Sequence, residues 1–446
     1  MPVNAIVDEG LGNSSYLVDL GDGGALVVDP ERDPRPYLSE LDRLGLQARF
    51  VVETHLHADF VSGGRELSAV GAELWAPAGS DLGYPHRRLH DGDEIDLGGL
   101  ALRVIATPGH TPEHLSYLLL DGSTPVGLFS GGTLMTGGVA RTDLLTAEQT
   151  DPLARAAYRS IKERLFTLPE NLAVYPTHGA GSFCSVGSAA ERTTAIGTER
   201  QSNPLFADDP DEDTFVARLL AGYGSFPPYF LELREVNRQG ARVHGTPLSP
   251  LPGMTVFEMD AAISDGAELV DVRGIEAFAD GHVPGALSNP WRRQFATWLG
   301  WLVPRETPLV FVADNEVDRQ DLAWAALTVG FENVLGELAG GIEAWTHAGR
   351  KVSRIPVIDH PDRARAILDV RQSSEHRSGH LPEAIHVELG QVAESANDLP
   401  RTGVLVHCGR GERAMTAASL LARAGQSDTA VFAGEPGRLG SLVTGE

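Results

Sequence analysis

Three short segments of the sequence place histidine directly after a predicted strand. They read E-T-H-L-H-A-D-F, T-P-G-H-T-P-E-H and Y-P-T-H-G-A-G. Because loops at strand ends carry binding sites, we expect these side chains to converge at one edge of a sheet. Imidazole and carboxylate groups gathered in this way predict a metal site. The candidate ligands are His55, His57, Asp59, His110 and His178.

A second reactive group is Cys408, which lies in H-C-G-R-G-E-R-A between the apolar strand 404–406 and a helical stretch 415–424. The glycines let backbone N–H groups turn inward. Together with the helix dipole, Arg410 and Arg413, these donors favour a thiolate. A thiolate can attack a sulfane sulfur and carry it as a persulfide, and the same cradle suits an oxyanion such as thiosulfate. The alternative is a buried structural cysteine.

The elements around Cys408 belong to an internal repeat. Glu268–Ala286 and Ala366–Ala384 share D-V-R and G-H-x-P at the same spacing, and each copy continues into an apolar strand, a short loop and a helix. Strand–loop–helix units repeated in this way predict two small α/β domains with parallel sheets. The position in the first copy that corresponds to Cys408 is Ala313, in the acidic loop V-A-D-N-E-V-D-R.

The histidine segments need a different scaffold, rich in short strands. We predict a hairpin of Tyr16–Leu20 with Ala25–Asp29 around GDGG. A helix is predicted over Asp151–Leu168, with Pro152 at its first position. The Pro/Gly-rich segment Gly240–Gly253 is the best domain boundary. Further strands are expected at Arg49–Glu53, Leu100–Ala106, Leu115–Leu120 and Leu172–Tyr175.

Length and composition limit the number of domains, the kinds of partner and the cellular compartment that we expect. The 446 residues are too many for one ordinary core, so two or three domains are expected. A net charge of -25 argues against nucleic acid and anionic membranes as partners. Two cysteines fit a reducing cytosol, so we expect a cytoplasmic protein, and no signal peptide or membrane-length apolar segment is visible. The sequence leaves open whether the chain forms a homodimer.

The two repeats resemble rhodanese domains over about residues 254–446. The second copy keeps that family's C-x-x-G-x-R loop as Cys408, Gly411 and Arg413, and the resemblance implies that Cys408 forms the persulfide. The first copy has no sulfur at Ala313, so its expected role is structural. A phosphatase-like use of Cys408 is disfavoured, because the loop is one residue shorter than the C-x5-R span of cysteine phosphatases.

The first part, about residues 1–240, resembles the metallo-β-lactamase fold, and within it the persulfide dioxygenases and hydroxyacylglutathione hydrolases. The resemblance implies an αββα sandwich and two metal positions. The first position falls on His55, His57 and His110, and the second on Asp59, Phe60 and His178. The carboxylate that bridges the two falls on Gly132. The A-R-T-D stretch matches a G-R-T-D stretch of the persulfide dioxygenases. It predicts substrate-binding roles for Arg141 and Asp143, with a structural Arg–Asp pair as the alternative.

Phe60 and Gly132 depart from that pattern, since neither can coordinate a metal. A dinuclear centre is therefore poorly supported, and we expect one ion or an empty site. Three histidines and a water suit Zn(II), whereas Fe(II) oxygenases prefer two histidines and a carboxylate. Cys184 has no adjacent cation and is interpreted as structural or as lining the pocket.

The predicted architecture is α/β: an αββα metallo-β-lactamase-like sandwich at 1–245, then rhodanese-like domains at 254–352 and 355–446, each with a parallel sheet. We expect a sulfur-handling enzyme in which a persulfide dioxygenase-like domain is coupled to sulfur transfer through Cys408. Its substrates would be a small thiol persulfide or thiosulfate. The alternatives are a hydroxyacylglutathione-type thioester hydrolase and a metal-poor binding scaffold in which only the last domain is active.

Overall fold

The computed structural model describes residues 3–187, 189–359, 365–401, 403–435, 437 and 439. The chain forms two compact units, with the boundary between Leu248 and Ser249 and with Leu327–Gly330 joined to the first unit. This boundary lies inside the Pro/Gly-rich segment Gly240–Gly253. The predicted end of the third domain, residues 440–446, lies outside the described residues.

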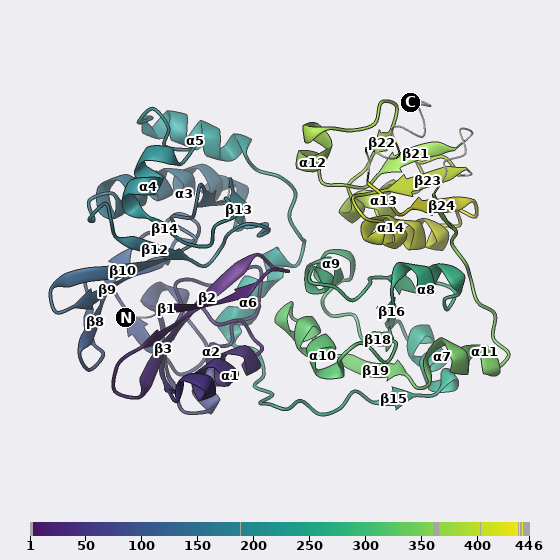
Figure 1. Ribbon diagram of the computed structural model, residues 1–446, viewed down its shortest axis with the longest axis horizontal. Helices are drawn as coiled ribbons and strands as arrows, with labels where there is room; N and C mark the ends of the chain where they lie inside the picture. Colours follow the sequence, from purple (N-terminus) through teal and green to yellow (C-terminus); the bar gives the residue numbers. More distant parts are fainter. Residues whose placement is uncertain are drawn as a thin grey trace. The chain divides into compact units, whose positions relative to one another are not determined.

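The first unit contains two sheets, each with six strands in the described part of the chain (Figure 1). The first sheet has the order β1 (Val3–Asp8), β2 (Asn13–Asp19), β3 (Gly24–Val28), β4 (Gln47–Val52), β5 (Glu73–Pro77) and β6 (Arg87–Leu89). The second has the order β14 (Thr194–Ala195), β12 (Ala173–Pro176), β10 (Thr124–Gly131), β9 (Leu115–Asp121), β8 (Leu100–Ala106) and β7 (Glu94–Asp96). A short pair, β11 (Val139–Ala140) and β13 (Ser185–Val186), lies apart from both.

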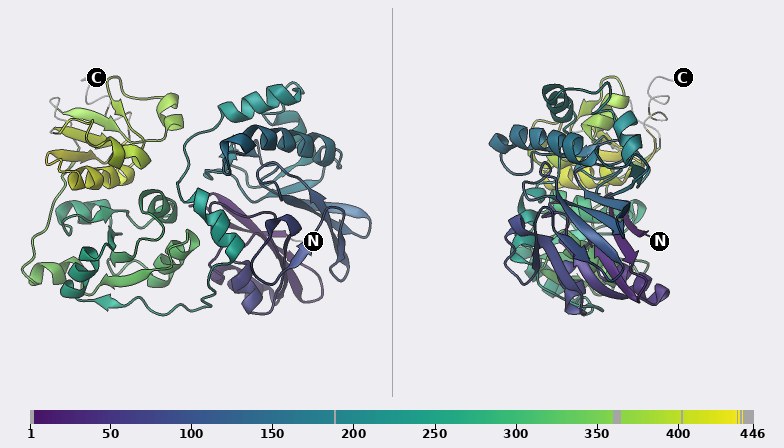
Figure 2. Two further views of the ribbon diagram at one scale, coloured as in Figure 1. Left: turned by 180° about the vertical axis from the view of Figure 1, so that it is seen from behind. Right: turned by 90° about the vertical axis from the view of Figure 1, so that its left-hand side faces the viewer.

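Helices cover the outer faces of these sheets, which gives the predicted αββα layering (Figures 1 and 2). A central core that includes Tyr16, Tyr117 and Phe129 joins the two sheets. Two outer cores, around Val51 with Leu67 and around Leu118 with Phe215, join each sheet to its helices. The helices are α1 (Arg35–Leu44), α2 (Gly64–Ala69), α3 (Ala147–Arg159), α4 (Ile196–Ser202), α5 (Glu212–Ala221) and α6 (Phe230–Gln239).

The predicted hairpin is confirmed, because β2 and β3 pair antiparallel with Tyr16 opposite Val28. The predicted start of the long helix is wrong. Helix α3 begins at Ala147, so Pro152 lies inside it rather than at its first position, and the helix continues as a π-helix over Ser160–Leu165. Proline at this place removes one intrahelical hydrogen bond. Packing of Ala154 and Ala157 against the second sheet's core outweighs that loss.

The second unit contains two all-parallel sheets with the same topology, which confirms the repeat. The first sheet has the order β15 (Gly253–Met254), β19 (Val334–Leu338), β18 (Leu309–Val312), β16 (Glu268–Asp271) and β17 (Leu287–Ser288). The second has the order β20 (Val357–Ile358), β24 (Thr429–Phe432), β23 (Val404–His407), β21 (Ala366–Asp369) and β22 (Ile385–His386).

Each sheet has its own helices, and the shared D-V-R motif has the same contacts in both. Arg273 donates two side-chain hydrogen bonds to Asp271 and one to the Gly281 carbonyl, and Arg371 does the same with Asp369 and Gly379. The motif therefore ties a strand end to the next helix end. The helices are α7 (Val256–Ser264), α8 (Ile275–Asp280), α9 (Phe295–Leu302), α10 (Arg319–Thr328) and α11 (Gly341–His347) in the first repeat, and α12 (Ser373–Ser378), α13 (Val392–Ser395) and α14 (Glu412–Arg423) in the second.

Helix α9 of the first repeat is rich in aromatic side chains, with Phe295, Trp298 and Trp301, and its residues 295–301 are buried. Trp301 packs against Gly390 of the second repeat, where a Cβ would come within 2.0 Å of the Trp301 Nε1 atom. No helix in the described part of the chain is long and apolar enough to cross a membrane.

Candidate metal centre and cysteine site

The five predicted metal ligands converge in the first unit, and all are buried. Three of them lie in the loop after β4, His110 lies between β8 and β9, and His178 follows β12. Three overlapping sets place their ligand atoms within 4.8 Å of one another: His55 with His110 and His178, His57 with Asp59 and His178, and Asp29 with His55 and His57. The structure therefore groups His178, rather than His57, with His55 and His110.

Hydrogen bonds on the outer side of the cluster fix which nitrogen of each ring points inward. Thr54 Oγ1 donates to Asp29 and so accepts from His55 Nδ1 at 2.7 Å. Asn13 Nδ2 donates to Asp59, so the Asn13 Oδ1 atom accepts from His178 Nδ1 at 2.9 Å. His110 Nδ1 donates to a backbone carbonyl at 2.7 Å. Ligand histidines in metal proteins are oriented by the same kind of partner.

His55 Nε2 and His178 Nε2 are 3.3 Å apart. Because the Nδ1 atom on the outer side of each ring carries the proton, the two Nε2 atoms present lone pairs to each other. Burial lowers the pKa of His55 far below its ordinary value, so its ring stays neutral. Two buried lone pairs at this distance repel each other unless a cation lies between them.

Three further ligand atoms are buried without a hydrogen-bond partner among the described residues. They are His57 Nδ1, Asp59 Oδ1 and His110 Nε2. Buried polar atoms are normally satisfied, so three ligand atoms without a partner in one cluster need an explanation. Borderline cations such as Zn(II) and Fe(II) take this mixture of imidazole and carboxylate donors. The residues present therefore fit a metal ion.

Asp29 organises the cluster from behind, and the sequence alone did not indicate it. Its carboxylate accepts from Thr54 and Thr177 and lies 3.3 Å from His57 Nε2. Burial by itself lowers the pKa of His57, but Asp29 and Glu53 outweigh it and raise that pKa to about 10. The two carboxylates make the ring more basic and hold its Nε2, which leaves Nδ1 directed away from them.

The loop that carries three of the ligands is also held by α6. Asn237 Nδ2 donates to the carbonyls of His57 and Phe60, and the Tyr229 hydroxyl donates to the carbonyl of Asp59. Arg234 forms a bidentate pair with Glu113, which in turn accepts from the Leu56 amide. The ligand loop is therefore fixed by hydrogen bonds to residues far away in the sequence.

Phe60 and Gly132 lie against different ligands of the cluster, Phe60 against His57 and Gly132 against His110. The Phe60 ring is fully buried and stacks on His57, with centroids 4.2 Å apart. A Cβ on Gly132 would lie 2.8 Å from His110 Cδ2, and the Gly132 amide already donates to His114 Nε2 at 3.0 Å. A carboxylate at this position would displace His110, so the bridging carboxylate of the two-metal pattern has no room here.

Arg141 and Asp143 form an ion pair, and the guanidinium of Arg141 donates four hydrogen bonds in all. The Nε and Nη2 atoms of Arg141 donate to the two carboxylate oxygens of Asp143 at 2.7 and 2.8 Å, and Nη1 donates to the carbonyl of Phe183. The guanidinium also stacks on Phe226. This geometry favours the structural alternative over substrate binding, while the Arg141 carbonyl orients His110.

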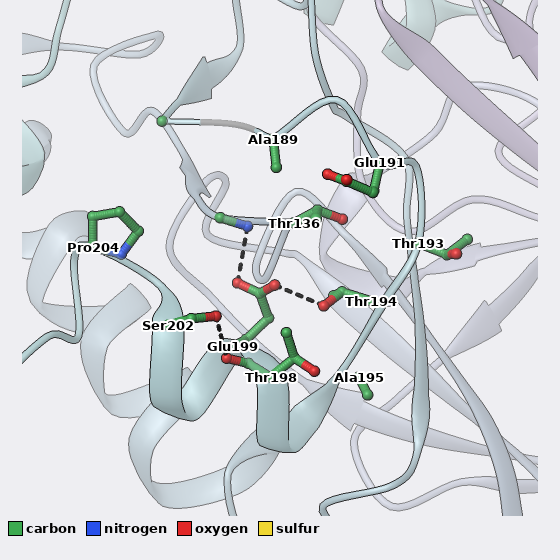
Figure 3. Close-up of a pocket in the computed structure, with 12 residues that line it drawn as sticks. Thr136, Ala189, Glu191, Thr193, Thr194, Ala195, Thr198, Glu199, Ser202 and Pro204 are labelled. Atoms are coloured by element: carbon green, nitrogen blue, oxygen red, sulfur yellow. Dashed lines mark hydrogen bonds between the residues drawn. The ribbon is translucent and has the colours of Figure 1, made fainter.

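Neither Cys184 nor the cavity shown in Figure 3 has the features of a reactive site. Burial raises the pKa of the Cys184 thiol well above its ordinary value, which agrees with a structural cysteine. A cavity of about 830 Å³ in the first unit is lined by Thr136, Glu191 and other, mostly polar residues. Figure 3 shows these residues around it. The Glu199 carboxylate in its wall accepts from Gly137, Thr194 and Asn203. The Glu199 carboxylate therefore already has hydrogen-bond donors from its own domain.

Cys408 lies where predicted, at the end of β23 and before α14. Its buried Sγ accepts a hydrogen bond from the Gly411 amide at 3.2 Å. Gly411 adopts φ +103°, a backbone conformation that favours glycine. Arg413 donates two hydrogen bonds to the Glu375 carboxylate at 2.5 and 2.8 Å, and Arg410 is exposed to solvent.

The corresponding loop of the first repeat is filled by its own arginine. Asp271 pairs with Val312 as Asp369 pairs with His407, so Ala313 is the structural equivalent of Cys408. Arg319 donates to the carbonyls of Asp314 and Val317 and to the Glu337 carboxylate. The loop therefore has no cysteine, and Arg319 donates to two of its carbonyl groups.

Comparison with known proteins agrees with these two units. Residues 8–178 match the metallo-beta-lactamase superfamily model, and residues 255–348 and 357–434 match the model of the rhodanese-like domain. The chain therefore carries a metallo-β-lactamase-fold domain followed by two rhodanese-like domains.

Individual relatives point in two directions. A hydroxyacylglutathione hydrolase from Methylobacillus flagellatus is 40% identical over 35% of this chain and 58% of its own length. The human mitochondrial persulfide dioxygenase ETHE1 is 34% identical over 38% of this chain and 64% of its own length. The chain thus spans about three fifths of these curated relatives. A solved metallo-beta-lactamase from Staphylococcus aureus subsp. aureus COL is 29% identical, with a TM-score of 0.67 over 76% of this chain and 99% of that one.

Proposed function

We propose that this protein is a sulfur-metabolism enzyme in which a persulfide dioxygenase-like metal domain is coupled to a sulfurtransferase that uses Cys408. The observation that carries the proposal is the pairing, on one chain, of a buried histidine–aspartate cluster able to hold a metal with a rhodanese loop whose cysteine accepts an amide hydrogen bond. A small thiol persulfide or thiosulfate would be the substrate. Two free cysteines fit a reducing, cytoplasmic setting.

The residues that would hold the ion are His55, His110 and His178, with His57 and Asp59 beside them. Bound Fe(II) supplies the redox chemistry of persulfide oxidation, whereas bound Zn(II) supplies a Lewis acid for hydrolysis. The chain's own contribution is to hold each imidazole in one tautomer through its outer hydrogen bonds. Similarity to the human persulfide dioxygenase supports the oxidative reaction.

The rhodanese reaction follows from the Cys408 loop. The Cys408 thiolate attacks the outer sulfur of thiosulfate, a new S–S bond forms, and sulfite leaves with the electron pair of the old S–S bond. Cys408 then carries a persulfide, which an acceptor thiolate or cyanide removes. A covalent carrier divides the transfer into two easier steps.

A thioester hydrolase of the hydroxyacylglutathione type is the second candidate, because a relative of that name is 40% identical. Phe60 and Gly132 weigh against it, since they remove two ligands of a two-metal centre. A metal-poor scaffold is the third reading. It requires well under one equivalent of metal in anaerobically purified protein, with no change in His110→Ala.

The sulfurtransferase assignment is tested with two matched variants. Cys408→Ala should abolish thiocyanate formation from thiosulfate and cyanide, because it removes the sulfur that carries the persulfide. Cys184→Ala should retain activity within about twofold, because that thiol is buried away from solvent. Equal activity in both variants would show that the assignment is wrong.

A further inference from the structure

The cysteine-free first repeat lies directly against the Cys408 loop. A Cβ on Gly411 would come within 3.0 Å of Ile275 Cδ1, so the start of α8 packs on the loop. The Ser288 amide donates to Ser419 Oγ on α14 at 3.1 Å, and Arg423 Nε donates to the Gly285 carbonyl at 2.9 Å. The end of β17 therefore faces the helix that begins at the Cys408 loop.

Arg292 follows β17 in this contact region. Its carbonyl accepts the Phe295 amide at 2.9 Å, which fixes its backbone at the start of α9. The Nε and Nη2 atoms of its guanidinium are buried and have no hydrogen-bond partner within the described ranges. The guanidinium interacts electrostatically with Cys408, Glu412 and Arg413, and burial lowers its pKa from the ordinary value.

An arginine in this state is unusual, because a buried donor without a partner costs free energy and a buried charge costs more. Arg413 avoids that cost through its two hydrogen bonds to Glu375. Arg292 has no such carboxylate partner in the described part of the chain, although its side chain is partly accessible to solvent. An anion bound beside Cys408 would fill its two open donors.

We propose that Arg292 is a substrate-binding residue of the Cys408 site, so that the first repeat supplies half of the anion pocket. This inference rests on the proposed sulfur transfer. The Nε and Nη2 donors would hold sulfonate oxygens of thiosulfate while Cys408 attacks its outer sulfur. As the S–S bond breaks, negative charge moves to the departing sulfite, and a guanidinium at those oxygens stabilises it.

The test compares Arg292→Gln with Arg292→Lys and with the neighbouring, exposed Arg293→Gln. For thiosulfate turnover, Arg292→Gln should raise KM at least about tenfold, the loss of about 1.4 kcal/mol of binding. Arg292→Lys should recover part of this loss, because it keeps the charge without the planar fork. Arg293→Gln should match the wild type. An unchanged KM in Arg292→Gln overturns the inference. The inference is also overturned if Arg292→Gln lowers kcat without changing KM, lowers the Tm, and Arg292→Lys does not recover the loss.

Direct binding separates this inference from the proposed function. Thiosulfate is titrated calorimetrically into Cys408→Ser, which cannot form a persulfide, and into Cys408→Ser with Arg292→Gln. Binding about tenfold weaker in the double variant supports the Arg292 site, even if the wild type shows no sulfur transfer. Equal binding, or no binding to either variant, overturns it, even if the wild type is active.

Discussion

At the scale of single residues, the metal cluster depends on side chains that are not ligands. Asn13 contacts two ligands at once, since it donates to Asp59 Oδ2 and accepts from His178 Nδ1. Asp29 similarly joins Thr54, Thr177 and His57. These partners decide which nitrogen of each ring is free to bind, and so they set the affinity of the site.

The Asn13 contacts lead to a testable expectation. Asn13→Ala should weaken metal binding by about 10- to 100-fold, the usual effect of losing an orienting partner. Competition with a chelator of known affinity would measure this change. Asn4→Ala is the matched control, because the Asn4 amide nitrogen has no hydrogen-bond partner among the described residues. If Asn13→Ala retained wild-type affinity, the tautomer argument would fail.

The residue scale is also where prediction from sequence was least complete. Local motifs predict His55, His57, Asp59, His110 and Cys408 as site residues, because each stands in a short segment at a strand end. They do not predict the orienting residues, since Asn13 and His178 are 165 positions apart and only the fold joins them. Arg292 was missed for the same reason, because no local motif marks a residue that acts on another repeat.

At the scale of elements, two loops at equivalent positions in the two repeats surround different residues. In the second repeat, the loop after β23 surrounds Cys408. In the first, the loop after β18 is occupied by Arg319, which donates to two of its carbonyls.

The repeat and its strands were predicted because apolar strands and D-V-R recur in the sequence. The start of α3 was predicted wrongly because Pro152 suggested a helix start that packing places five residues earlier.

The occupied loop makes a further prediction. Ala313→Cys, introduced together with Cys408→Ser, should not restore sulfur transfer. The loop repels a sulfur oxyanion through three acids, Asp314, Glu316 and Asp318. Arg319 already donates hydrogen bonds to two of the loop's carbonyl groups. Thiocyanate formation from thiosulfate and cyanide would measure the activity. Recovery of more than about a tenth of wild-type activity would contradict this account, since it would mean that a cysteine alone makes the loop functional.

At the scale of the whole molecule, the two chemistries lie in two compact units. Cys408→Ser should therefore leave the metal content unchanged, while His110→Ala should lower the metal content and leave thiosulfate turnover within about twofold of wild type. Effects of substitutions at independent sites are normally additive. Elemental analysis and sulfurtransferase assays on both variants and on the double variant check this. A loss of turnover in well-folded His110→Ala would instead show that the units are coupled.

Oxygen consumption tests the central claim most directly. Protein loaded anaerobically with Fe(II) is mixed with glutathione persulfide and oxygen, alongside metal-free protein and His110→Ala treated in the same way. The account predicts oxygen uptake by the loaded wild type well above the metal-free control, loss of that uptake in His110→Ala, and its retention in Cys408→Ser. No uptake above the metal-free control, together with hydrolysis of a hydroxyacylglutathione thioester, would contradict the account and favour the hydrolase.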